Sequence, residues 1–313
     1  MTRTTAADPR AWTAATVDAP QRWHHPLDRE LLANLRAVVA VQSSERPVTD
    51  LRLNADQREA WHESLAPALR DLEQGRGFVI LDRLPVDRMS QHEAVALYWL
   101  VGQLLSEPFA QNVQGTLLYD VRDTGQDLSA GARFSVTSYE SSFHTDNSFG
   151  DEILDYVGLL CLKGAKSGGI SQNVSGYAAI DVLKREHPDV LEVLLQPLHV
   201  DRRGGFREGE APTVLRPVVA WDGPELILRY LRYWIEVGQE KAGQPLTADQ
   251  RRALDVLDAV LQRPELRVEF VLEPGQMYFI NNRWILHNRT AFVDHQELER
   301  RRHLVRLWLK ARG

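Results

Sequence analysis

Apolar residues recur at the spacing of an α-helix in the first third of the chain. Over residues 27–41 they share one side of the predicted helix, at Leu31, Leu32, Leu35, Val38 and Val39. Two more helices are predicted to begin after Asn54 and Ser90, because each of these capping residues stands three positions before Gln or Glu. The first of these two helices is expected to end at Gly75 or Gly77.

From about residue 116 the pattern changes to short apolar runs rich in β-formers, separated by polar or glycine-containing loops. Two helices interrupt these runs, from Ser175 to about His187 and from Thr247 to about Gln262. An earlier buried strand is predicted at residues 78–81. The spacing of the strands is typical of a sandwich or barrel. The predicted strands after residue 116 are 116–121, 134–137, 156–162, 214–221, 226–230, 266–272, 277–280 and 303–309.

Composition narrows the class of protein. The 313 residues are 43% hydrophobic and 26% charged, as in soluble globular proteins. A formal net charge of −6 argues against non-specific binding to nucleic acid, which needs a basic surface. The single cysteine, Cys161, excludes an internal disulfide, and its apolar surroundings predict a buried side chain. The chain lacks a signal-peptide core and a membrane-spanning apolar run, so we expect a cytoplasmic protein with no membrane partner.

One stretch near the middle of the chain carries the strongest chemical signal. In Phe143-His144-Thr145-Asp146, His144 and Asp146 point to the same side if the segment is extended. With the late His287 they supply two imidazoles and one carboxylate, the facial set that holds non-haem Fe(II). Two other His-x-Asp patterns compete, His187-Pro188-Asp189 and His199-Val200-Asp201. The first is expected at a turn between helices, whereas the second is expected on a strand.

The last predicted strand carries two arginines. Alternation along residues 302–309 places Arg302 and Arg306 on one face, together with Leu304 and Trp308. Both faces of this strand are largely apolar and are therefore expected to be covered. A buried guanidinium needs an anion. The spacing alone favours structural ion pairs with Asp or Glu over a bound anionic ligand.

Four segments in this order and spacing resemble the motifs of the taurine-dioxygenase-like (TauD/TfdA) Fe(II)/2-oxoglutarate oxygenases, which include a clavaminate-synthase-like branch. The resemblance covers about residues 75–310. It implies a mostly β fold with flanking helices around a double-stranded β-helix, or jelly roll. The segments are Phe143-His144-Thr145-Asp146, Ser167-Gly168-Gly169-Ile170-Ser171, Asn281-Asn282-Arg283-Trp284-Ile285-Leu286-His287 and Arg301-Arg302-His303-Leu304-Val305-Arg306.

The resemblance also implies a role for each matching residue. His144, Asp146 and His287 are the implied iron ligands. Ser171 stands where the family has a hydroxyl residue that bonds 2-oxoglutarate, and Arg302 matches the arginine that holds its distal carboxylate. The implied reaction hydroxylates an unactivated C–H bond and releases succinate and carbon dioxide.

The substrate is less defined by the sequence. Arg306 matches a second family arginine that often faces substrate, and Glu140 is a candidate to hold an amine. Together they suggest a small amino-acid-like, zwitterionic or anionic substrate, although Glu140 is equally explained as a solvated loop residue. Residues 228–234, rich in arginine and aromatics, are interpreted either as a lid or as packing on the core.

Two other function classes remain open. A metal-dependent hydrolase uses the same two histidines and aspartate to activate water. A non-catalytic jelly roll that binds a small molecule is the other class, and in it the two histidines and the aspartate catalyse no reaction.

The expected organisation is a flexible segment over residues 1–22 followed by one oxygenase domain over 23–313. That domain has a helical part at 23–110 and a jelly-roll core with insertions at 111–313. Residues 201–213, with three glycines and mixed charge, are expected to form a mobile surface loop. The oligomeric state is left open, with a homodimer as one option.

Overall fold

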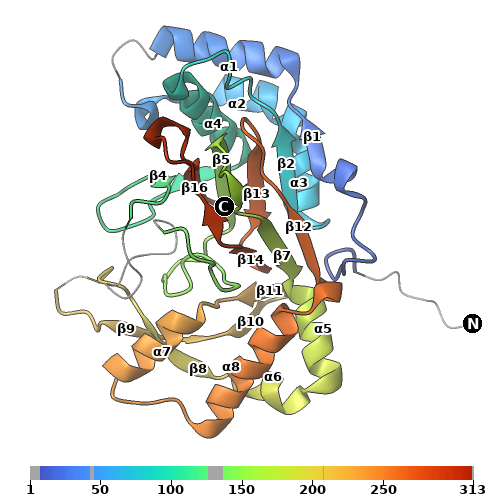
Figure 1. The fold of residues 1–313 in the computed structure, drawn as a ribbon, viewed down its shortest axis with the longest axis vertical. Helices are drawn as coiled ribbons and strands as arrows, with labels where there is room; N and C mark the ends of the chain where they lie inside the picture. Colours follow the sequence, from blue (N-terminus) through green and yellow to red (C-terminus); the bar gives the residue numbers. More distant parts are fainter. Residues whose placement is uncertain (1–7, 43–45, 126–136, 207, 312–313) are drawn as a thin grey trace, which may run out of the picture.

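The computed structural model describes residues 8–42, 46–125, 137–206 and 208–311. Its centre is a seven-stranded sheet with the order β1-β2-β13-β5-β16-β3, in which β4 also pairs with β16 (Figure 1). All pairs are antiparallel except β1 with β2. The strands are β1 (His24–Pro26), β2 (Phe78–Asp82), β3 (Glu107–Phe109), β4 (Leu118–Val121), β5 (Tyr156–Lys163), β13 (Met277–Asn281) and β16 (His303–Lys310).

One face of this sheet is covered by the helices of the N-terminal part. Side chains alternate between the faces of a strand, and Leu160, Phe279 and Leu307 join the buried cluster formed with these helices. These helices are α1 (Arg29–Gln42), α2 (Ala55–Trp61), α3 (Ala66–Glu73) and α4 (Gln91–Leu105). In the view of Figure 1, α1, α2 and α4 lie in the upper part of the molecule and α3 lies beside β2.

The opposite face looks toward a smaller antiparallel sheet of order β12-β7-β14. Val157, Tyr278 and Leu304 of the main sheet share one buried cluster with Val174 and Leu286 of the smaller sheet. The catalytic candidates of the sequence lie in this interior. The smaller sheet consists of β7 (Ser171–Ser175), β12 (Arg267–Phe270) and β14 (Ile285–Arg289).

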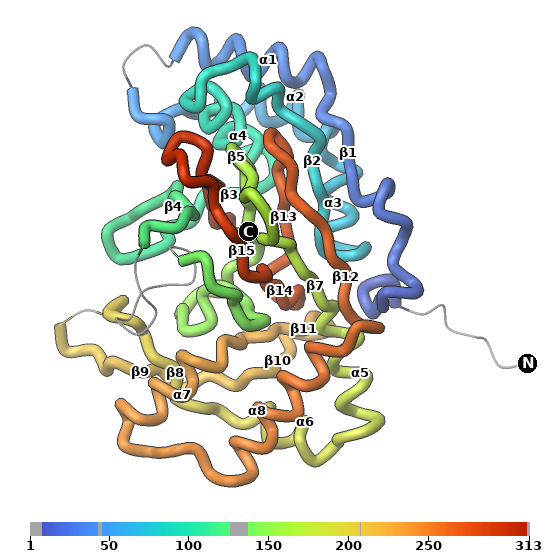
Figure 2. Tube along the Cα trace, viewed as in Figure 1, coloured from blue at the N-terminus to red at the C-terminus, as the bar shows by residue number. Residues whose placement is uncertain are grey.

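A third group of elements lies beyond the smaller sheet, in the lower part of Figures 1 and 2. It comprises four helices and the hairpins β8/β9 and β10/β11. A further short pair, β6 with β15, lies beside the main core. The bounds are α5 (Gly176–Glu186), α6 (Pro188–Leu194), α7 (Arg232–Lys241), α8 (Ala248–Leu261), β6 (Ser167–Gly168), β8 (Pro197–Asp201), β9 (Thr213–Pro217), β10 (Val219–Asp222), β11 (Glu225–Leu228) and β15 (Phe292–Val293).

The helix predictions are confirmed at α1, α4, α5 and α8, and Asn54, Ser90, Ser175 and Thr247 each cap a helix. One prediction was wrong, because the helix after Asn54 does not run unbroken to Gly75. It ends at Trp61 and is followed by a 3-10 turn, His62–Leu65, before α3 begins. Pro67 lies in the first turn of α3, where its missing N–H is tolerated, but it cannot continue the preceding helix.

Most strand predictions are confirmed, but the run 214–221 is divided at Val218 into the end of β9 and the start of β10. The prediction at 134–137 falls mostly outside the described residues. Residues 228–234 form the end of β11 and the start of α7. The pattern of apolar residues did not predict this helix. The loop 201–213 connects β8 to β9, with residue 207 outside the described residues.

The described part of the N-terminal segment, residues 8–22, packs on the body of the protein. The Trp12 ring is buried, its Nε1 donates to the main-chain oxygen of Arg76 at 2.7 Å, and its edge meets Phe78. The whole is a mixed α/β structure around a central sheet. No helix among the described residues is both long and apolar enough to span a bilayer.

Candidate active site

Two imidazoles from distant parts of the chain are joined through the main chain. His144 pairs with His287 in an antiparallel bridge, with N-to-O distances of 3.0 Å in both directions. His287 is fixed by β14, which pairs with β7. The bridge brings the ring centroids to 4.3 Å from each other. The predicted pairing of these two residues is therefore present in the structure.

The carboxylate of Asp146 completes the group. Metal-binding atoms of His144, Asp146 and His287 all lie within 4.8 Å of one another, and the described residues contain no second cluster of this kind. Asn282 holds the main chain of Asp146, since its Oδ1 accepts from Asp146 N at 2.8 Å and its Nδ2 donates to Asp146 O at 3.0 Å. The amide of Asn282 therefore sets the position from which the carboxylate projects.

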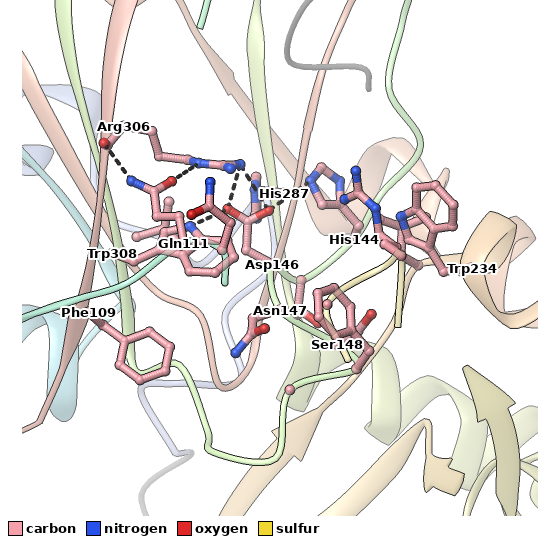
Figure 3. A pocket seen from close by; sticks show the side chains of 18 of the residues that line it. Phe109, Gln111, His144, Asp146, Asn147, Ser148, Trp234, His287, Arg306 and Trp308 are labelled. Carbon is pink, nitrogen blue, oxygen red and sulfur yellow. Dashed lines mark hydrogen bonds and ion pairs between the residues drawn. The ribbon is translucent and has the colours of Figure 1, made fainter. Parts of the chain in front are cut away.

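Two residues of β16 orient that carboxylate. Trp308 Nε1 donates to Asp146 Oδ2 at 2.9 Å, and Arg306 Nη1 donates to the same oxygen at 3.0 Å (Figure 3). Arg306 is held in turn by Gln111, whose Oε1 accepts from Arg306 Nε at 2.8 Å. Burial raises the pKa of Asp146, but Arg306, the two imidazoles and the Trp308 bond outweigh it and lower the pKa to about 2. The carboxylate is ionised at neutral pH.

The imidazoles are held in a form suited to metal binding. The carbonyl of Ser142 accepts from His144 Nδ1 at 2.8 Å, so Nδ1 carries the proton and Nε2 keeps its lone pair, 3.7 Å from Asp146 Oδ1. His287 Nδ1 is buried and has no hydrogen-bond partner among the described residues. Burial lowers the pKa of both rings, to about 3 in His287, where His144 adds to the effect.

Two neutral imidazoles and one carboxylate on one side of a cavity fit a non-haem ferrous ion, which leaves other coordination positions open. The orphaned nitrogen of His287 supports this fit, because a buried polar atom without a partner is otherwise costly.

The competing His-x-Asp patterns have structural explanations. His199 Nδ1 meets Thr213 Oγ1 at 3.1 Å within the β8/β9 hairpin, and buried Asp201 binds Lys241 at 2.9 Å. Asp189 lies at the junction of α5 and α6 and pairs with Arg252 at 2.6 Å. Neither pair gathers a third metal ligand among the described residues.

A cavity of about 870 Å³ opens beside the three candidate ligands. Ser171, Arg302 and Arg306, which were predicted to bind cosubstrate or substrate, all contribute to its lining. Other walls come from the segment after Asp146, the β8–β9 loop and the start of α7. Trp234 of α7 and His144 both line this cavity and are labelled in Figure 3.

Arg302 is a buried cation that forms no ion pair with the described carboxylates. Its side chain lies over the Phe292 ring at 5.0 Å, and no hydrogen bond or ion pair from its guanidinium to another described residue is present. The residue is 7% exposed, and burial lowers the pKa of Arg302 to about 10. The predicted alternative, a structural ion pair, therefore applies to Arg306 but not to Arg302.

A tight turn next to this arginine precedes Ser171, since a Cβ at Gly169 would lie 3.5 Å from Arg302 Nε. At Gly168 φ is +74°, and a Cβ there would lie 2.3 Å from the main-chain oxygen of Ala291. The next residue, Gly169, has a positive φ as well. Only glycine fits such a position. The turn leads directly into β7, where Ser171 pairs with Arg289 of β14.

The two predicted substrate residues are placed differently. Arg306 lines the cavity, but its guanidinium is engaged by Asp146 and Gln111. Glu140 is exposed, does not line the cavity, and accepts a hydrogen bond of 3.4 Å from Asn288 Nδ2. Both substrate roles stay predictions, and this placement does not support an amine contact for Glu140.

The sequence analysis did not predict a role for three residues that bind Asp146 or Arg306. They are Gln111, Asn282 and Trp308. Trp308 had a signal, because alternation along β16 places it on the Arg306 face. Asn282 lies within the segment 281–287, in which only His287 was assigned a role from the sequence. Gln111 carried no signal, since only the fold brings it to Arg306.

Comparison with known proteins shows which family this chain resembles. The model of the taurine catabolism dioxygenase TauD, TfdA family matches residues 42–308. FR-33289 synthase of Streptomyces rubellomurinus is 29% identical, over 95% of this chain and 88% of that protein. Uridine-5'-phosphate dioxygenase of Amycolatopsis sp is 31% identical, over 60% of this chain and 66% of that protein. A structure of asparagine oxygenase with Fe(II), (2S,3S)-3-hydroxyasparagine and succinate has a similar fold, with a TM-score of 0.66 and 22% identity over 92% of this chain and 93% of that one.

Proposed function

This chain belongs to the taurine catabolism dioxygenase TauD, TfdA family, and from that premise we propose that it hydroxylates an unactivated C–H bond of a small amino-acid-like or anionic substrate. It is a non-haem iron, 2-oxoglutarate-dependent oxygenase. One oxygen atom of O2 enters the product as hydroxyl and the other enters succinate, while 2-oxoglutarate loses carbon dioxide.

Each residue of the site has a defined task in this reaction. His144, Asp146 and His287 hold the iron, which supplies the redox chemistry for oxygen activation when bound. Arg306 and Trp308 fix the orientation of the Asp146 carboxylate by binding Oδ2 at 3.0 and 2.9 Å, while Arg306 reaches Oδ1 only at 3.4 Å. The apolar walls given by Val157 and Leu159 limit the access of water to the reacting groups.

The observation that carries the proposal is Arg302. Its buried guanidinium lines the same cavity as the three ligands and lacks an acidic partner among the described residues. A dicarboxylate provides that anion, bound at one end by the planar fork of the arginine. Ser171, at the start of β7, lines the cavity as well and supplies a hydroxyl donor.

The relatives support a small polar substrate. One relative is named for action on uridine 5'-phosphate, and the asparagine oxygenase structure contains a hydroxylated amino acid. A cavity of about 870 Å³ accommodates molecules of that size range together with the cosubstrate.

The finer fold assignment is also a proposal. The main sheet and the β12-β7-β14 sheet face each other across a buried interior, which supports a double-stranded β-helix within residues 111–313. The residues before it form a helical part of the same domain, over 23–110, and a cytoplasmic location suits the reduced Cys161.

Anaerobic reconstitution tests the function directly. Fe(II) and 2-oxoglutarate added together should produce a weak visible charge-transfer band, whereas Fe(II) alone should not. Admitting oxygen should then convert 2-oxoglutarate to succinate. A metal-dependent hydrolase would instead turn over a substrate without oxygen or 2-oxoglutarate, and a binding protein would form no succinate.

A further inference from the structure

The acidic residues that line the cavity are all engaged. Asp146 binds Arg306, Asp151 binds Arg202, and Glu152 binds Lys310. Glu210 also has an interaction partner. The lining therefore offers no free carboxylate to a cationic group of a substrate. The charged groups of the lining are therefore better suited to bind an anionic group of a substrate.

A cluster of three arginines lies at the rim of the cavity, on the side of the β8–β9 loop. Arg202 follows β8, Arg216 lies on β9, and Arg229 follows β11. We call these three residues the arginine cluster. Arg202 itself lines the cavity, and the other two reach it through Asp151 and Gly150, which also belong to the lining.

The arginine cluster shares a single carboxylate. Asp151 Oδ1 accepts from Arg216 Nη2 at 2.7 Å, while its contacts to Arg202 are looser, at 3.3 and 3.4 Å. Within the described part of the chain, the Arg229 guanidinium has one hydrogen bond, from Nη1 to the main-chain oxygen of Gly150 at 2.6 Å. Among the described residues, three cations therefore lie beside one anion, which leaves two of the positive charges without a carboxylate partner.

The surroundings make that excess costly. Burial and the neighbouring Arg216 lower the pKa of Arg229 to about 10. The Nε atoms of Arg202 and Arg216 are buried and have no hydrogen-bond partner in the described part of the chain. Asp151, by contrast, is 66% exposed at its side chain, so it neutralises its partners only weakly. Crowded guanidiniums with unsatisfied donors are the usual form of a site for a multiply charged oxyanion.

We propose that the arginine cluster binds a phosphate or phosphonate group carried by the substrate, at the end remote from the carbon that is hydroxylated. This inference rests on the proposed function and names its substrate class. A dianion with three terminal oxygens matches the two unpartnered charges and the unused donors. Arg306, held by Asp146, is then not needed to bind the substrate anion.

Binding of a probe to the metal-free protein tests the site apart from catalysis. Methylphosphonate titrated into the chelator-treated protein at pH 8 should release or absorb heat on saturable binding. Arg202→Gln should weaken that binding at least tenfold, and Arg229→Gln should do the same. Arg252→Gln is the matched control, because Arg252 of α8 pairs with Asp189 of α6 and does not line the cavity. A thermal melt of each variant confirms that it is folded.

A catalytic measurement links the site to the substrate. 2-Amino-5-phosphonopentanoate should stimulate succinate formation more than norleucine, which has no phosphonate. Arg202→Gln should raise the KM for the phosphonate with little change in kcat. Inorganic phosphate should compete with it, and binding of inorganic phosphate alone, without stimulation by any phosphonate, would overturn the substrate assignment.

The proposal is also overturned if the wild type does not bind methylphosphonate, or if wild type and Arg202→Gln bind it equally. These results differ from failure of the proposed function, which would appear as a missing Fe(II)/2-oxoglutarate band in the untreated protein.

Discussion

Trp308 and Asp146 are joined by a hydrogen bond in which the indole Nε1 donates to Oδ2 over 2.9 Å. The same oxygen accepts from Arg306, so both donors act on one side of the carboxylate. Oδ1 lies 3.7 Å from His144 Nε2 and accepts only a longer bond of 3.4 Å from Arg306 Nη1. The strand that carries Trp308 therefore binds Oδ2 more closely and leaves Oδ1 as the oxygen more open to a metal.

Trp308→Phe should weaken metal binding by about tenfold, because loss of a residue that orients a metal ligand typically costs 10–100-fold in affinity or activity. The phenyl ring retains most of the packing. Anaerobic titration with Co(II), followed by its visible absorption, measures the affinity. Trp221→Phe serves as a control on an exposed ring, and equal affinities in the two variants would show that the indole bond does not matter.

Arg302→Ala and Arg306→Ala should have separate effects. The first leaves a carboxylate of 2-oxoglutarate unpaired, a loss of about 3–5 kcal/mol, or a hundredfold or more in apparent affinity. The second removes a donor to Asp146 and should mainly weaken metal binding. Titration of the anaerobic iron complex with 2-oxoglutarate separates them. If Arg306→Ala lost 2-oxoglutarate and Arg302→Ala kept it, the roles would be exchanged.

Asp146→Ala should abolish hydroxylation and leave the fold intact, since it removes a metal ligand. Asp201→Ala should keep turnover but lose about 1–3 kcal/mol of stability, because buried Asp201 accepts from Lys241 Nζ and from the main chain of Arg203. Succinate assays and thermal melts of both variants measure the two effects. Normal turnover in Asp146→Ala would exclude its carboxylate as a ligand.

Gly168→Ala should lower the free energy of unfolding by about 1–3 kcal/mol, since its φ of +74° is strained for any residue with a Cβ. The affinity for 2-oxoglutarate should fall too, because the affected strand β6 pairs with β15, which carries the Phe292 ring under Arg302. Gly164→Ala is the control, with open space around its Cβ position. Identical melting curves for the two variants would contradict this account.

The three candidate metal ligands were predictable because imidazole and carboxylate groups are the side chains that bind such metals, and period-two spacing puts His144 and Asp146 on one side. The faces of β16 were predictable for the same reason. These inferences need only local geometry.

Two strands of the smaller sheet, β7 and β14, were not predictable from hydrophobicity, whereas β12 was. Strand β7 is polar, and several of its buried side-chain atoms are bound by polar side chains of other strands, as between Tyr278 Oη and Asn173 Oδ1 at 2.6 Å or Asn288 Nδ2 and Gln172 Oε1 at 2.8 Å. Pairing of Arg306 with Asp146 was equally hidden, because it depends on the register of strands that are remote in sequence.

The bridge between His144 and His287 couples assembly of the site to completion of the fold. Its main-chain bonds exist only once β14 has docked, so the unfolded chain has no high-affinity arrangement of the three ligands. An ion that binds only the folded protein stabilises it in proportion to the logarithm of its concentration over Kd. Thermal stability should therefore rise with added metal, and the melting temperature becomes a record of occupancy that needs no substrate.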